Sequence, residues 1–176
     1  MSNENTPAPL VGIVMGSDSD WPKIKGVAKA LEQFDIPHEI NVMSAHRTPE
    51  VVQEYATTAI DRGIKVMIAA AGGAAHLAGV VASHTTLPVI GIPVPTAMMG
   101  GLDSLLATVQ MPGDVPVATV GAGMGGPRNA GLLAVQILAL SEPGLREKLD
   151  QFKLDLVGKV GEKNQRLQDK IAEEAE

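Results

Sequence analysis

The chain of 176 residues contains no cysteine, and aromatic residues make up only 2% of it. The absence of cysteine excludes disulfide bonds, thiolate nucleophiles and cysteine-ligated zinc sites. The net charge of −6 and the lack of a basic stripe argue against nucleic-acid binding. No apolar run reaches the roughly 18 residues of a membrane span, and "MSNENTPAPL" lacks the regions of a signal peptide. We therefore expect a cytoplasmic protein with no nucleic-acid or membrane partner.

Several motifs of metal and cofactor enzymes are also missing. The four histidines lack metal-ligand spacing such as H-E-x-x-H, and neither a G-x-S-x-G elbow nor a P-loop occurs. The stretch "GAGMGG" at 121–126 matches G-x-G-x-x-G, but no further strand with an acidic residue follows it, as a dinucleotide site requires. We therefore expect neither a metal nor an organic cofactor.

The residues that are present predict one compact α/β domain. Apolar residues make up 45% of the chain and charged residues 19%, which suits a single domain with a real core. Short, continuous apolar runs predict strands at 10–16, 38–44, 65–73, 87–94 and 115–123. Helical periodicity or helix-start signals fall between and after them, at 17–35, 48–63, 100–111 and 127–140. Because such strands alternate with helices, we expect a three-layer, doubly wound parallel sheet.

The two ends of the chain differ from this domain. We expect a disordered N-terminal arm at 1–8, the α/β domain at 9–143 and a charged helical extension at 144–176. The predicted helix at 127–140 is apolar nearly all round, and one helix cannot bury every face against its own sheet. This pattern predicts a homo-oligomer.

Polar clusters follow the predicted strands, where open α/β sheets bind their ligands. In "GSDSDW" Gly16 allows a sharp turn, and Ser17 and Ser19 can offer hydroxyls beside the free amides of a helix start, which suits a phosphate. The alternative is that Asp18 or Asp20 merely caps the helix.

The second cluster is Ser44, His46 and Arg47, at the end of the second strand. Arg47 can contact a phosphate or carboxylate with two donors, and an imidazole such as His46 exchanges protons near neutral pH. The alternative is a solvated loop with a structural histidine. The third cluster, "AAAGGAAHLAG" at 69–79, leaves room for a ligand near the backbone and contains His76 as its one polar side chain. The alternative there is close strand–helix packing.

Four motifs, "GSDSDW", "SAHRTP", "AGGAAHLAG" and "GLDSLLATVQMP", occur in this order. Together they resemble the catalytic subunits of bacterial phosphoribosylaminoimidazole carboxylase, over roughly residues 10 to 140. The resemblance implies a flavodoxin-like fold, a homo-octamer with active sites between subunits, and an aminoimidazole ribonucleotide substrate. The "GGAAHL" segment resembles the mutase branch, which moves a carboxylate from N5 to C4. A second branch carboxylates the aminoimidazole directly with carbon dioxide.

The resemblance also implies roles for individual residues. His46 resembles the general acid and base, and Ser17, Asp20 and Arg47 resemble substrate-binding residues. The rest of the predicted substrate pocket comprises Gly16, Ser19, Ser44, Gly72, Gly73, His76 and Leu77. A noncatalytic nucleotide-phosphate binding protein on the same fold is the alternative, and it would make His46 dispensable.

Overall fold

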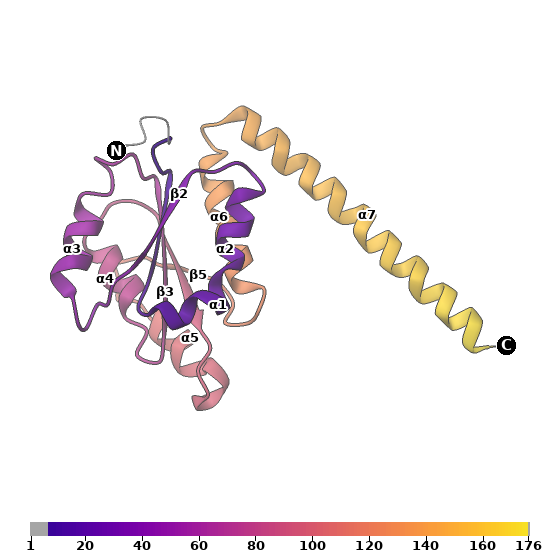
Figure 1. The fold of residues 1–176 in the computed structure, drawn as a ribbon, viewed down its shortest axis with the longest axis horizontal. Helices are drawn as coiled ribbons and strands as arrows, with labels where there is room; N and C mark the ends of the chain where they lie inside the picture. Colours follow the sequence, from indigo (N-terminus) through magenta and orange to yellow (C-terminus); the bar gives the residue numbers. More distant parts are fainter. Residues whose placement is uncertain (1–6, 176) are drawn as a thin grey trace. The chain divides into compact units, whose positions relative to one another are not determined.

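The computed structural model describes residues 7–175, and a five-stranded parallel sheet forms its centre (Figure 1). The strand order is β2-β1-β3-β4-β5, which is the flavodoxin-like order. The strands are β1 (Val11–Met15), β2 (His38–Val42), β3 (Val66–Gly72), β4 (Val89–Val94) and β5 (Ala118–Thr119). The predicted doubly wound α/β fold is therefore confirmed.

Helices cover both faces of the sheet (Figure 1). One face carries α1 (Trp21–Ile24), α2 (Gly26–Glu32) and α6 (Gly126–Leu138). The other carries α3 (Pro49–Thr57), α4 (Leu77–Ser83) and α5 (Leu102–Val109). Two short 3-10 helices, η1 (Asp18–Asp20) and η2 (Met98–Gly101), precede α1 and α5.

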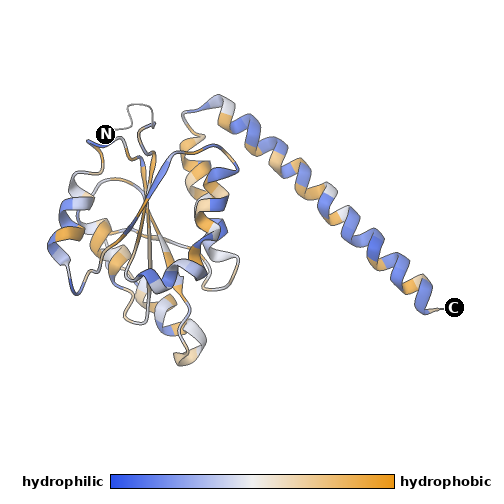
Figure 2. Cartoon of the chain, viewed as in Figure 1, coloured by the Kyte–Doolittle hydropathy of each residue, from blue (hydrophilic) through white to orange (hydrophobic). Residues whose placement is uncertain are grey.

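The core is aliphatic, as the shortage of aromatic residues predicts. Every residue of β1 and β4 is buried, and the central strands are the most hydrophobic part of the sheet (Figure 2). Four apolar positions of the predicted helix at 17–35 are buried as well: Ile24, Val27, Leu31 and Phe34. Burial of these side chains between helices and sheet supplies the main driving force for folding.

Three local expectations were wrong in detail. The predicted helix at 17–35 is divided into η1, α1 and α2, and α1 has Pro22 in its first turn. The predicted strand at 115–123 keeps two residues, since β5 pairs only with β4 and proline at position 116 cannot donate to a sheet. In the edge strand β2, Ile40 and Val42 remain 39% and 55% exposed, so this strand is not covered on both faces.

The winding of the sheet determines where a ligand can bind. The chain passes from β1 to β2 in one direction across the sheet and from β3 to β4 in the other, and β1 and β3 are neighbours. The connections after β1 and β3 therefore run over opposite faces, which opens a crevice at the carboxyl ends of these strands.

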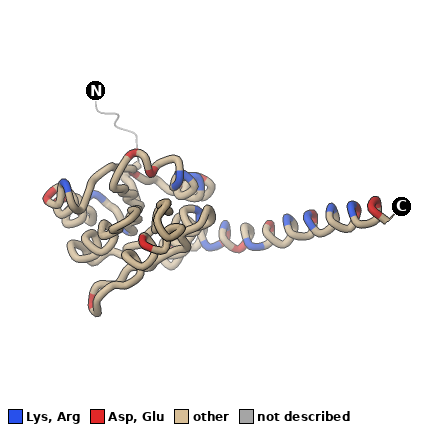
Figure 3. Tube along the Cα trace, turned by 90° about the horizontal axis from the view of Figure 1, so that it is seen from below, with Lys and Arg blue, Asp and Glu red and all other residues tan. Residues whose placement is uncertain are grey.

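The chain divides into two compact units, up to Leu138 and from Ala139 onward. The second unit contains α7 (Pro143–Glu174), a continuous helix with alternating charges (Figure 3). The division predicted near residue 143 stays a prediction, and residues 1–6 of the predicted arm lie outside the described residues.

Candidate active site

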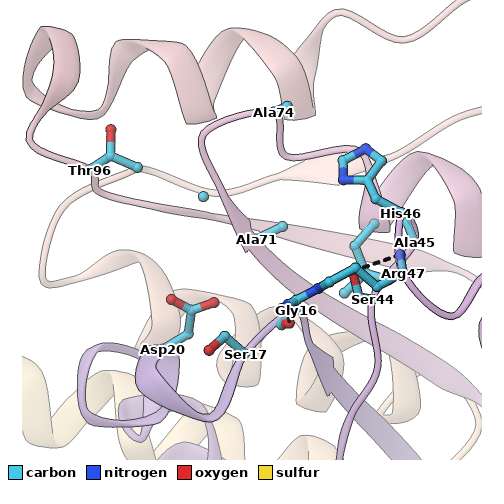
Figure 4. Close-up of a pocket in the computed structure, with 12 residues that line it drawn as sticks. Gly16, Ser17, Asp20, Ser44, Ala45, His46, Arg47, Ala71, Ala74 and Thr96 are labelled. Carbon is cyan, nitrogen blue, oxygen red and sulfur yellow. Dashed lines mark hydrogen bonds between the residues drawn. The ribbon is translucent and has the colours of Figure 1, made fainter.

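A cavity of about 470 Å³ lies at the carboxyl ends of β1, β2 and β3 (Figure 4). In this view Asp20 and Ser17 lie on one side of it with Thr96, and Ser44, Arg47 and His46 lie on the other. The cavity is lined by Gly16, Ser17, Asp20, Ser44, Ala45, His46, Arg47, Ala71, Gly72, Ala74, Leu77 and Thr96.

The segment after β1 supplies hydroxyls and a carboxylate. Ser17 caps η1, where its Oγ accepts a hydrogen bond from the Ser19 amide at 3.3 Å and lies 2.8 Å from Ser19 Oγ. Burial raises the pKa of the Asp20 carboxyl above its usual value, and the positive charge of Lys23 partly opposes this rise. Asp20 is therefore an ionisable group at the edge of the cavity that the fold holds partly away from water.

The loop after β2 is closed by its own hydrogen bonds. The Ser44 amide donates to Thr48 Oγ1 at 3.0 Å, and that hydroxyl donates to the Ser44 carbonyl at 3.1 Å. Arg47 Nη2 donates to the Gly16 carbonyl at 2.8 Å, and its Nε donates to Ser44 Oγ at 3.3 Å. Arg47 thus joins the ends of β1 and β2, while its guanidinium keeps further N–H donors for an anion.

The loop after β3 brings a second imidazole to the first. His46 Nε2 and His76 Nδ1 are 2.9 Å apart, and the ring centroids lie 4.9 Å apart at an interplanar angle of 79°. Both side chains are exposed in the single chain. Because a hydrogen bond needs one donor and one acceptor, only one of the two facing nitrogens carries a proton.

The structure brings most of the predicted site residues together. Eight of the eleven line the cavity: Gly16, Ser17, Asp20, Ser44, His46, Arg47, Gly72 and Leu77. The other three are absent from the lining. Ser19 and His76 hydrogen-bond to the lining residues Ser17 and His46, and Gly73 follows the lining residue Gly72 and donates from its amide to Ser104. Their assignment to substrate or catalysis stays a prediction.

Sequence reasoning missed four lining residues, which are Ala45, Ala71, Ala74 and Thr96. The three alanines lie inside motifs that were singled out, but a methyl group carries no chemical signal of its own. Thr96 follows β4 and donates from Oγ1 to the two carboxylate oxygens of Asp103 at 3.0 and 2.9 Å. Its position just after a strand was the one available signal.

Within residues 7–175, no group of three or more histidine, cysteine, aspartate or glutamate side chains could hold a metal ion. None of the helices over the same residues has the length and apolar character needed to cross a membrane. The "GAGMGG" stretch follows β5 and leads into α6, and a Cβ on Gly126 would lie 1.8 Å from the Gly121 carbonyl oxygen. At Gly126, glycine therefore serves close backbone packing.

Comparison with known proteins identifies the family. The family model described as AIR carboxylase matches residues 10–158. The chain belongs to the AIR carboxylase family. It is 58% identical to the N5-carboxyaminoimidazole ribonucleotide mutase of Mycobacterium leprae, with 93% of this chain and 94% of that protein covered. It is 54% identical to the mutase of the same name from Pyrococcus horikoshii, with 92% and 90% covered.

A solved structure agrees with this assignment. The chain superimposes on the crystal structure of Treponema denticola PurE with a TM-score of 0.78 and 31% identity, covering 90% of this chain and 98% of that one. The predicted family, fold class and enzyme class, an isomerase of the mutase type, are therefore confirmed.

Proposed function

We propose that this AIR carboxylase family member converts N5-carboxyaminoimidazole ribonucleotide to 4-carboxyaminoimidazole ribonucleotide, a step of purine biosynthesis. One observation supports the proposal most directly. A single cavity combines a guanidinium, a carboxylate and the imidazole of His46, which contacts a second imidazole, in a chain that is 54% and 58% identical to proteins named as this mutase.

Binding groups surround the cavity on the side of β1. The Ser17 hydroxyl and the Arg47 guanidinium suit the phosphate of a ribonucleotide, since arginine offers a phosphate several N–H donors in one plane. The Asp20 carboxylate can accept hydrogen bonds from sugar hydroxyls. In this arrangement the phosphate and ribose bind beyond the carboxyl ends of β1 and β2, and the aminoimidazole ring extends towards His46.

The chemistry requires two proton transfers and one carbon transfer. Cleavage of the bond from N5 to the carboxylate carbon releases carbon dioxide, and His46 gives a proton to N5 as that bond breaks. The C4 carbon of the electron-rich ring then attacks the carbon dioxide and forms the new carbon–carbon bond. His46 removes the remaining proton from C4, which restores the aromatic ring and returns the imidazole to its starting state.

Small side chains assist this sequence. Ala45 and Ala74 line the cavity from the loops after β2 and β3, and Ala71 and Gly72 line it from the end of β3. Such a wall holds carbon dioxide beside the ring without offering a nucleophile that would compete for it. His76, at 2.9 Å from His46, fixes which nitrogen of His46 carries the proton between the two steps.

The test is an assay with N5-carboxyaminoimidazole ribonucleotide in the absence of ATP, metal and added bicarbonate. We expect rapid formation of the 4-carboxy product in the wild type, and a loss of turnover of roughly 10²- to 10⁴-fold in His46→Asn. Ligand binding should survive in His46→Asn, as calorimetry would show.

Other outcomes of this assay would contradict the proposal. Product formed only from aminoimidazole ribonucleotide and carbon dioxide would identify a direct carboxylase. Binding of the ribonucleotide without any turnover would identify a noncatalytic binding protein instead. Wild-type turnover in His46→Asn would remove His46 from the proton transfers.

We further propose that the enzyme is a cytoplasmic homo-oligomer, and an octamer as the resemblance implies. Large apolar side chains on η2 and α5 are exposed in the single chain, among them Met98, Leu102, Leu106 and Val109. The sequence predicted an oligomer instead from the helix at 127–140, which largely coincides with α6, and there the small residues Ala130 and Ala134 are already buried within the single chain. Sedimentation velocity would measure the subunit number, and a monomer at micromolar concentration would overturn the proposal.

A further inference from the structure

Among the described residues, the chain buries two polar side chains, Ser104 and Thr108, which are 0% and 2% exposed. Both belong to α5. Thr108 donates to the Ser104 carbonyl at 2.8 Å, a bond within its own helix. The Ser104 hydroxyl instead accepts a bond at 2.9 Å from the amide of Gly73, which lies 31 residues away in the loop after β3. A buried hydroxyl without such a partner would be costly.

The Ser104 bond holds a loop whose conformation is unusual. Gly73 has a φ of +68°, in the left-handed region that favours glycine. The preceding Gly72 lies so close to β4 that an added Cβ would be 3.0 Å from the Val94 carbonyl oxygen. Gly72 is the last residue of β3 and pairs with Val94 of β4, so the loop begins at a fixed point of the sheet and is then held to α5 through Gly73.

This loop forms one wall of the cavity and ends at the imidazole pair. Gly72 and Ala74 line the cavity, and His76 at the end of the loop meets His46 Nε2 at 2.9 Å. A continuous path therefore leads from the Ser104 hydroxyl through the Gly73 amide to His76 and His46. Each link is a short stretch of backbone or a hydrogen bond.

The residue before Ser104 holds a second wall. The two carboxylate oxygens of Asp103 share the hydroxyl proton of Thr96, a cavity residue that follows β4. In the first turn of α5, Asp103 therefore holds the segment after β4 and Ser104 holds the loop after β3. Neither Asp103 nor Ser104 itself lines the cavity.

We propose that Ser104 is a positioning residue for the imidazole pair, acting through Gly73 and His76 and touching no substrate. The inference rests on the proposed function in so far as His46 is the proton carrier. Without the Ser104 hydroxyl, the Gly73 amide loses its acceptor and the loop can rotate towards water. His76 then leaves His46, and the protonated nitrogen of His46 is no longer selected.

The experiment compares Ser104→Ala with Thr108→Val, a matched control that removes the other buried hydroxyl of α5. In Ser104→Ala we expect kcat to fall roughly 10- to 100-fold, the size of effect that a displacement of about 1 Å causes. The KM should change by less than about twofold, because the side chains proposed to bind the phosphate and ribose lie on other loops. The pH profile of kcat should shift, and Ser104→Thr should restore part of the rate. Thr108→Val should lose thermal stability and keep wild-type kinetics.

Two measurements do not depend on activity. In nitrogen-15 NMR spectra of the ligand-free protein, the imidazole signals of His46 and His76 should change in Ser104→Ala and not in Thr108→Val. In the wild type, hydrogen exchange at the Gly73 amide should be slow even though the residue lies in a loop. The exchange measurement needs no variant and so remains informative if Ser104→Ala does not fold.

Several results would overturn the inference. They are fast exchange at Gly73, unchanged imidazole signals in Ser104→Ala, or an equal loss of kcat in both variants. A wild type that does not turn over the ribonucleotide would defeat the proposed function alone, since the imidazole signals would still decide whether Ser104 positions the pair.

Discussion

Single side chains that line this cavity also hold the surrounding backbone in place. Arg47 donates one hydrogen bond to the Gly16 carbonyl and another to Ser44 Oγ, so the guanidinium is held in place in the ligand-free protein. The geometry costs little entropy on binding, because the guanidinium is already ordered. Ser17 likewise has two roles, since its hydroxyl caps η1 and its side chain lines the cavity.

Asp20 offers a prediction about pH. Its pKa is raised, chiefly by burial, so ionisation of the folded protein costs more than ionisation of the unfolded chain. For a carboxyl whose pKa is raised by folding, this cost is absent at pH values below 3.8, the unperturbed pKa. The cost grows as the pH rises through the pKa of the folded protein. We therefore expect Asp20→Asn to be at least as stable as the wild type at pH 7, with no such gain below pH 3.8.

Urea unfolding of Asp20→Asn and the wild type at several pH values measures this difference. The same variant should bind the ribonucleotide more weakly, since an amide cannot replace a carboxylate as a pure acceptor. A variant that is less stable than the wild type at pH 7 would show that the carboxylate stabilises the fold, whereas the upward shift of its pKa predicts the opposite.

At the scale of elements, the pair α2 and α6 shows how small residues shape the fold. At Gly131 an added Cβ would lie 2.7 Å from both the Ala30 Cβ and the Val27 carbonyl oxygen. The two helices therefore approach each other backbone to backbone. We expect Gly131→Ala to destabilise the protein by about 1–3 kcal/mol, the usual cost of overpacking a core.

A matched control exists in α7. Gly158 lies inside that helix, and apart from its chain neighbours and the nearby helix backbone no atom lies within 4 Å of an added Cβ. Gly158→Ala should raise the helix signal in circular dichroism and stabilise the helix by up to about 1 kcal/mol. Thermal unfolding of both variants tests the pair of expectations. If Gly131→Ala melted at the wild-type temperature, the two helices would have to be able to move apart.

At the scale of the whole molecule, the family match and the structure differ in extent. The family model ends at residue 158, whereas α7 continues to Glu174. All twelve residues that line the cavity lie between Gly16 and Thr96. The last part of α7 therefore contributes no side chain to the cavity described above.

We expect a chain that ends at Gly158 to keep its rate per active site within about twofold of the full-length protein. The measurement is steady-state turnover, with circular dichroism as the control for folding and sedimentation velocity for the subunit number. A tenfold loss of rate at an unchanged subunit number would give the segment beyond Gly158 a part in catalysis.

Much of this architecture could be predicted from local patterns. Continuous apolar runs indicated β1, β3 and β4 and the parallel sheet, because a strand buried on both faces has no polar side, whereas the predicted burial of β2 on both faces was wrong. The polar residues at strand ends, such as Ser17 and Arg47, could be predicted to meet because parallel strands end at one edge. That rule brings Ser17, Ser44, His46 and Arg47 to one edge, whereas Gly72 and Leu77 were expected in the pocket because of the family resemblance.

The remaining features depend on contacts between distant segments. The sequence by itself determined the fold class, the sheet's buried strands and which loops carry chemistry, because those follow from the periodicity of neighbouring residues. Only the tertiary structure decided that His76 meets His46, that Ser104 holds Gly73 and that Thr96 completes the cavity. The physical reason is that these partners are 30 or more residues apart or on different loops, and strand order and crossover, not local pattern, determine their distance.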